Sequence, residues 1–153
     1  MTYNVKFADV TAAISNISVS GVAIKDISAI PEQALMLCPV MFPSPDFVTG
    51  LNPVVDTLGT AGSERITLDY DITYIYAHCT INAGVGGVFA AYAGLVTNIV
   101  AIIVTIMTND NPRDGATLRL KTISKAGAVN DLAGNTYWGC ALTLHVTELC
   151  EVP

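Results

Sequence analysis

Two carboxylates, Asp69 and Asp71, stand two residues apart in the segment ERITLDYDITYIYAHCT. Paired carboxylates on one face can perform general acid–base chemistry when a second functional group is held nearby. No His, Ser or Lys accompanies this pair at a spacing that the sequence makes readable. We therefore interpret Asp69 and Asp71 as part of a solvated face or of a contact between subunits.

The histidines and cysteines are the next candidates for chemistry. His78 adjoins Cys79, and Cys140, His145 and Cys150 follow one another with four residues between each pair. Neither spacing matches a structural zinc pattern, and Cys140 and His145 are expected on opposite faces of a strand. We predict no metal site. The start of the chain does not resemble a secretory signal, so we predict that the cysteines are reduced thiols.

A glycine cluster at Gly84, Gly86 and Gly87 precedes an apolar segment, as a phosphate-binding loop does. The match fails because no Lys followed by Ser or Thr is present, and Phe89 or Ala90 stands where a dinucleotide-binding motif needs its last Gly. We interpret the cluster as a turn before a helix. No catalytic residue and no cofactor is predicted, so the chain is not expected to be an enzyme.

The composition limits the partners that the chain can hold. Only 13% of the residues are charged, 52% are hydrophobic, and the formal net charge is −6. No basic run is present, so tight binding of nucleic acid through its phosphates is not expected. Because charged residues are about half as frequent as usual, we expect lipid, a partner subunit or small polar residues to cover much of the surface.

The period of the apolar residues and the length of each apolar segment predict the helices and strands. Residues 5–17 place apolar side chains at helical spacing, whereas 64–80, 116–124 and 135–149 alternate like half-buried strands. The last two strands are expected to pair as a hairpin, with a loop at 126–134. Residues 34–42 read as a weak edge strand. Residues 43–62 contain three Pro and three Gly, and we predict a long surface loop there.

Residues 80–109 contain no charged side chain. Residues 86–107 are long enough to cross a membrane, and basic residues follow them. However, amphipathic strands on both sides require a cover for their apolar face, and no other predicted helix is long enough. We therefore predict a helix that covers the sheet. A single-span membrane protein with a soluble β domain is the alternative.

The predicted helix has two stripes. The first is a row of large apolar residues expected to face the sheet: Phe89, Tyr92, Val96, Ile99, Ile103 and Ile106. The second is small and weakly polar, and we expect it to contact another subunit: Ala90, Gly94, Thr97, Asn98, Ala101 and Thr105. The predicted fold class is α+β, a mixed or antiparallel sheet of about four strands packed against one long central helix plus a short N-terminal helix. Residues 1–153 are predicted to form one domain.

The order of these elements, together with the final strand, resembles the tail terminator and neck proteins of tailed bacteriophages. In those proteins the last strand commonly has an aromatic residue and a Gly followed by Leu, Val and Glu. Here these are Trp138-Gly139, Leu144, Val146 and Glu148. The resemblance covers most of the chain in element order. The central helix of this chain is more apolar than the family leads us to expect.

The resemblance implies a structural virion protein without catalytic residues. Its partners are expected to be five further copies in a six-fold ring, the tail tube protein and the head-tail connector, with DNA passing through the lumen. Assembly is expected in the host cytoplasm, without a membrane. A tail tube or head decoration subunit is the alternative within this class. Residues 43–62 and the turn at 109–115 are the expected docking segments.

The negative net charge fits a channel that repels DNA. We therefore predict a set of charged residues at the lumen or at ring contacts, on the basis of net charge and position alone: Asp69, Asp71, Asp110, Arg113, Asp114 and Asp131.

Overall fold

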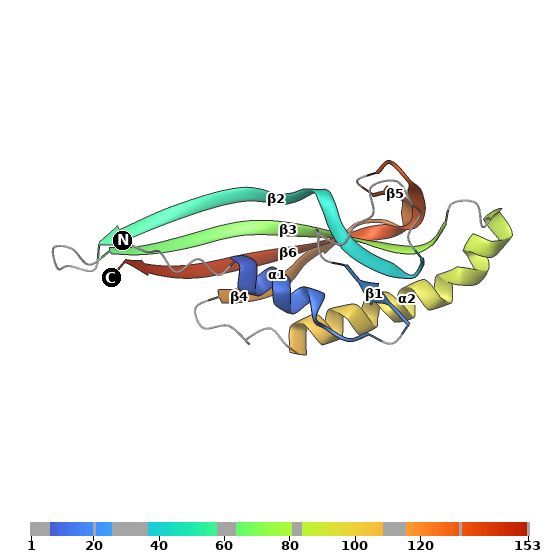
Figure 1. Ribbon diagram of the computed structural model, residues 1–153, viewed down its shortest axis with the longest axis horizontal. Helices are drawn as coiled ribbons and strands as arrows, with labels where there is room; N and C mark the ends of the chain where they lie inside the picture. Colours follow the sequence, from blue (N-terminus) through green and yellow to red (C-terminus); the bar gives the residue numbers. More distant parts are fainter. Residues whose placement is uncertain are drawn as a thin grey trace.

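A computed structural model gives the tertiary structure of the protein (Figure 1). It describes residues 7–19, 21–25, 37–57, 64–80, 84–108, 116–131 and 133–152. The elements in chain order are α1 (Phe7–Ser15), β1 (Ala23–Ile24), β2 (Val40–Thr57), β3 (Glu64–Thr80), α2 (Gly84–Thr108), β4 (Ala116–Ile123), β5 (Gly127–Asn130) and β6 (Thr136–Val152).

The six strands form one sheet with the order β1-β2-β3-β6-β4, and β5 pairs with β6 beside this path. All pairs are antiparallel except β1 with β2. Strands β3 and β4 lie on opposite sides of β6 and run in the same direction. Such a connection cannot be a tight turn, and α2 makes the crossover.

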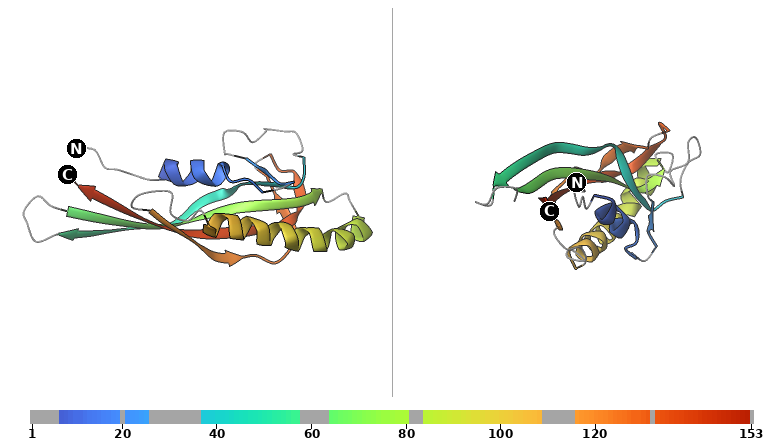
Figure 2. Two further views of the ribbon diagram at one scale, coloured as in Figure 1. Left: turned by 90° about the horizontal axis from the view of Figure 1, so that it is seen from below. Right: turned by 60° about the vertical axis from the view of Figure 1, so that its left-hand side comes forward.

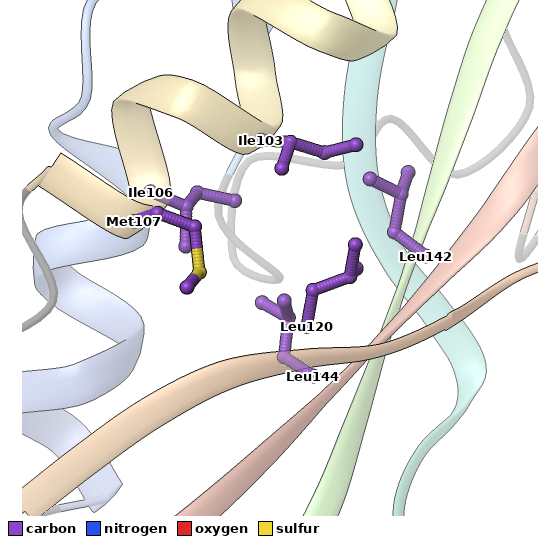
Figure 3. Close-up of a pocket in the computed structure, with 6 residues that line it drawn as sticks. All are labelled: Ile103, Ile106, Met107, Leu120, Leu142 and Leu144. Atoms are coloured by element: carbon purple, nitrogen blue, oxygen red, sulfur yellow. The ribbon is translucent and has the colours of Figure 1, made fainter.

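The sheet curls, and both helices lie along its concave face (Figures 1 and 2). The main core fills the space between them, because one parity of β3 and β6 is apolar. It contains Tyr70, Ile72 and Tyr74 of β3 with their register partners Val146, Leu144 and Leu142 of β6. From α2, Ile103 and Ile106 point toward Leu120 of β4 and Leu142 and Leu144 of β6 (Figure 3).

A second, smaller core lies on the other face of the sheet. It joins Val40 and Phe42 of β2 with Ile75 and Ala77 of β3 and Tyr137 of β6. Strand β5 lies at this end of the sheet, and its Val129 packs against the cluster. Both faces of the sheet are therefore buried at one end, while the other end extends beyond both helices (Figure 1).

The predicted fold class is wrong. We expected about four strands around one long central helix, whereas the structure is mostly a curled sheet of six strands with two helices on one side. The difference arises because residues 43–62, which are rich in Gly and Pro, and residues 126–134, which contain two Gly, resemble loops when read locally. Both stretches contain strands, so the sheet, and not a helix, organises the molecule.

The predicted loop at 43–62 is wrong for residues 43–57, which belong to β2. Residues 58–62 lie outside the described part of the chain. The register between β2 and β3 shifts between Pro43 and Val48 and again between Thr49 and Asn52, where Gly50 has a φ of 65°. These irregularities accommodate the breakers, and Pro is tolerated because an edge strand does not need every N–H for a neighbour.

Other predicted elements agree better with the structure. The expected strand at 64–80 is β3, and the expected helix at 5–17 contains α1, which buries Val10 and Ile14. The predicted pairing of the last two long strands is confirmed by the ladder between β4 and β6. The predicted loop at 126–134 is wrong in part, because Gly127–Asn130 form β5.

Helix α2 turns a slightly different face to the sheet from the one predicted. Leu95, Ile99, Ile102 and Ile106 are buried, whereas Val96, which we placed in the core stripe, is 58% exposed. Within the described residues, no helix has the length and apolar character needed to cross a membrane.

Candidate functional site

A polar cluster on the outer face of the sheet contains the carboxylate pair singled out in the sequence. Asp71 lies opposite His145 in the β3–β6 register, and Asp69 lies opposite Thr147. The curled sheet also brings Lys121 of β4 beside Asp71. No sequence pattern predicts this grouping, because His145 and Lys121 lie more than 40 residues away from the pair along the chain.

Short contacts connect the members of this polar cluster. Lys121 Nζ lies 2.7 Å from Asp71 Oδ2, and His145 Nδ1 lies 2.9 Å from Asp71 Oδ1. His145 Nε2 lies 3.4 Å from Asp69 Oδ1, to which the Thr147 hydroxyl donates at 2.7 Å. The hydrogen bond from Lys121 holds the pKa of Asp71 below its usual value; partial burial opposes this, and His145 adds to it.

This geometry favours a cross-strand ion-pair network over a catalytic base. An imidazole that activates a nucleophile has a carboxylate on one nitrogen and the nucleophile on the other. In the polar cluster both nitrogens of His145 face carboxylates, those of Asp69 and Asp71. With His145 neutral, two carboxylates and one ammonium leave a net charge of −1. The net charge of the polar cluster is therefore less negative than the charge of −2 that Asp69 and Asp71 would have without Lys121.

Asp131 has a structural position that its sequence context did not reveal. It is only 3% exposed and closes the turn between β5 and β6. Its carboxylate accepts hydrogen bonds from the backbone N–H groups of Ala133 and Asn135, the Asn135 amide and the Tyr137 hydroxyl, at 2.9–3.0 Å. An Asp that satisfies the backbone two residues on forms an Asx turn, so this carboxylate does not face solvent.

The other predicted lumen or ring-contact residues, Asp110, Arg113 and Asp114, lie outside the described residues. The turn at 109–115, which we named as a docking segment, lies there too. Of the acidic residues predicted for a lumen, the structure thus places Asp69 and Asp71 together on the outer face and Asp131 in the interior.

The predicted contact stripe of α2 is divided between the sheet and solvent. Asn98 turns toward β3 and donates to the Tyr76 hydroxyl at 2.8 Å, and this hydroxyl lies 2.6 Å from His78 Nδ1. Burial raises the pKa of Tyr76 to about 12 and lowers the pKa of His78. Gly94 lies against the same imidazole, since a Cβ there would be 3.3 Å from His78 Cε1.

The remaining residues of this stripe divide in the same way. Thr97 is exposed, while Ala101 and Thr105 are half-buried. Both threonine hydroxyls donate to carbonyls of their own helix, at 2.9 and 2.7 Å. Ala90 belongs to the part of α2 whose side chains are not described. The stripe is therefore not a continuous free surface.

The exposed apolar surface of α2 lies beside that stripe. Val96, Val100 and Val104 are 53–58% exposed and follow one another at intervals of four residues, and Met107, at 42%, continues the row. We call these four residues the helix patch. Sequence reasoning missed it because the apolar residues of α2 occur all round the helix, so that periodicity alone does not decide which side is buried.

A second apolar surface lies on the far end of the sheet, which extends beyond the helices (Figure 1). Val48 and Val55 lie opposite Ile72 and Ile66 of β3, so they point to the core-facing side. With Leu51 and the half-buried Leu68, they form what we call the arm patch. Val48, Leu51 and Val55 are 41–62% exposed. The prediction of a loop at residues 43–62 left the arm patch unpredicted, because residues of a loop cannot be assigned to one face of a sheet.

The arm patch contains a cavity of about 230 Å³. Its walls are Val48, Leu51, Leu68 and Tyr70, together with Phe7 of α1, and Glu148 of β6 also lines it. The side chain of Glu148 is already fully buried. The exposed walls of the cavity are thus apolar, and the surface suits aliphatic side chains more than a polar metabolite.

The cysteines have the character expected of reduced thiols. Cys38, Cys79 and Cys140 form no disulfide in the described part of the chain, and Cys140 is buried. Burial raises the pKa of the Cys140 thiol to about 11, which disfavours the reactive thiolate. Among the described residues, no three His, Cys, Asp or Glu side chains are arranged to hold a metal ion.

Comparison of the sequence with protein-family models and with curated proteins gives no match.

Proposed function

We propose that this chain is a structural subunit of a ring that caps the tail tube of a tailed bacteriophage and joins it to the head-side connector. The observation that carries the proposal is the arm patch, an exposed apolar surface of the sheet that borders Phe7 of α1. Soluble monomers rarely leave such a surface open, and a neighbouring subunit is its natural cover.

The low charge of the chain supports the same proposal. Extensive contacts between subunits deplete charged residues from the surfaces that meet, and here only 13% of all residues are charged. DNA passes through the lumen of the proposed ring without specific binding. Asp69 is the acid of the polar cluster best suited to face it, because Lys121 compensates Asp71.

Negative-stain imaging of the purified protein, combined with its mass in solution, tests this function. Closed rings of defined subunit number are expected, and the proposal predicts about six subunits. Open-ended tubes would instead identify a tail tube subunit. A monomer that persists at high protein concentration would overturn every assembly function considered for this chain.

Binding to the expected partners provides the second test. The rings should cap isolated tail tubes at one end and stop their elongation, and they should not be retained on duplex DNA at physiological salt. Tubes that elongate unchanged in the presence of the protein would contradict the role of terminator even if rings form.

A further inference from the structure

We propose that the helix patch of one subunit docks onto the arm patch of the next, so that α2 lies between two sheets. This inference rests on the proposed ring function and deepens it by naming the contact. Both surfaces belong to the same chain, both are aliphatic, and their side chains are about half exposed. Neither patch contains a charge that docking would have to desolvate.

The positions of the two patches on the fold support this pairing. Helix α2 already covers one end of the concave sheet face with Leu95, Ile99, Ile102 and Ile106. The arm patch lies on this same side of the sheet, next to Phe7 of α1. A second α2, supplied by another copy, would cover the arm much as the first covers its own sheet. The helix patch points away from its own sheet, as this arrangement requires.

The shapes of the two patches are complementary. The helix patch presents a row of protruding side chains at Val96, Val100 and Val104, one per turn. The arm patch is hollowed by the cavity of about 230 Å³ between β2, β3 and α1. An aliphatic side chain of the row can enter this cavity as a knob enters a hole. Because Glu148 is already buried, docking covers no exposed carboxylate there.

The two patches expose their side chains to a similar extent. The exposed fractions are 42–58% for the helix patch and 41–62% for Val48, Leu51 and Val55 of the arm patch.

The pairing also accounts for a closed assembly. The helix patch and the arm patch are different surfaces, so their contact is heterologous. Each subunit that docks through its helix patch leaves its arm patch open for another. Repetition of such a contact closes into a ring when the rotation between neighbours permits it. A contact between two helix patches would instead stop at a dimer.

Two charge insertions, Val100→Glu and Leu51→Glu, test the contact in the full chain. Each alters an exposed position of one patch, so circular dichroism and thermal unfolding should match those of the wild type. Each should raise the concentration for half-assembly at least about a hundredfold, because an unpaired charge is buried on docking. Sedimentation equilibrium gives the mass. Thr122→Glu, at an exposed position on the outer face of β4, is the matched control and should assemble like the wild type.

Mixing the two variants distinguishes the proposed contact from a symmetric one. Val100→Glu keeps an intact arm patch and Leu51→Glu keeps an intact helix patch, so an equimolar mixture should form dimers, although each alone is monomeric. If each variant alone forms rings like those of the wild type, this contact is overturned but the ring function is not. Self-association of Leu51→Glu alone would also overturn it. A monomeric wild type would overturn the ring function itself.

Discussion

At the scale of residues, the structure divides charges that look alike in the sequence. Asp71 takes part in an ion-pair network with Lys121 and His145, whereas Asp131 accepts four hydrogen bonds inside a turn. The ion pair of Asp71 with Lys121 contributes little to the free energy of unfolding, because Lys121 is largely exposed. Asp131 is buried, so the loss of its carboxylate leaves several donors without an acceptor.

Replacement of Asp131 by Ala should therefore destabilise the fold. We expect the free energy of unfolding to fall by about 3 kcal/mol, because the hydroxyl of Tyr137 and two backbone N–H groups lose their acceptor. Urea denaturation followed by circular dichroism measures the change. Asp46→Ala, at an exposed position of β2, is the control and should change it by less than about 0.5 kcal/mol.

The same carboxylate predicts how stability depends on pH. Burial alone would raise the pKa of Asp131, but hydrogen bonds from Asn135 and Tyr137 outweigh it and lower the pKa. The unfolded chain then binds this proton more readily than the folded one. The stabilisation is complete above the usual Asp pKa of about 4 and is lost as pH falls through the lower folded value.

The stability advantage of the wild type over Asp131→Asn should accordingly shrink as pH is lowered from about 6 to about 2. Urea titrations at several pH values give this difference. A constant advantage across the range would show that the carboxylate charge is not what stabilises the turn.

At the scale of elements, a close contact between two strands explains why position 139 is a glycine. In the sequence, Gly139 is noticeable only as part of the Trp138-Gly139 motif. Gly139 in β6 lies against β3 where the register shifts between Ala77 and Cys79. A Cβ at this position would be 1.8 Å from the carbonyl oxygen of Tyr76. A backbone atom cannot yield as a flexible side chain does, so only Gly fits.

Gly139→Ala should lower the free energy of unfolding by about 3 kcal/mol or more, because the clash forces β3 and β6 apart. Gly127→Ala is a matched control on β5, since a Cβ there meets no atom within 4 Å. Thermal unfolding of both variants gives the comparison. Equal midpoints would mean that the approach of the two strands is looser than the structure indicates.

At the scale of the whole molecule, the two apolar patches lie on different elements and are both exposed. Such a surface is what the proposed contact between subunits requires. The polar cluster does not serve as a strong charged contact, because Lys121 already compensates one of its two carboxylates. Association should therefore depend on apolar burial more than on ion pairs.

This dependence predicts the response to salt. Raising the concentration of sodium chloride from about 0.1 M to about 1 M shortens the Debye length from about 10 Å to about 3 Å, but should not dissociate the assembly. Sodium sulfate should strengthen it, because excluded salts favour burial of apolar surface. Light scattering measures the mass at each concentration. Dissociation by sodium chloride would assign the contact to charged residues.

The sequence by itself determined the strand at 64–80, the first helix and the pairing of the last two long strands, because their alternation or helical spacing is local information. It predicted only the start of β2, because residues 40–42 belong to the expected weak strand at 34–42. It could not determine the rest of β2 or β5, since Pro43, Gly50 and Gly127 are read locally as breakers. Only the partner strand decides whether bulges and an open edge accommodate them.

Only the tertiary structure decided which surfaces remain available. An evenly apolar helix has no preferred side until it meets a sheet, so the exposure of Val100 could not be read from its neighbours in the chain. The same holds for the polar cluster, whose members meet through strand order. The residue pattern limits which faces can be buried, whereas the arrangement of β3, β6 and β4 selects which are buried and which remain exposed.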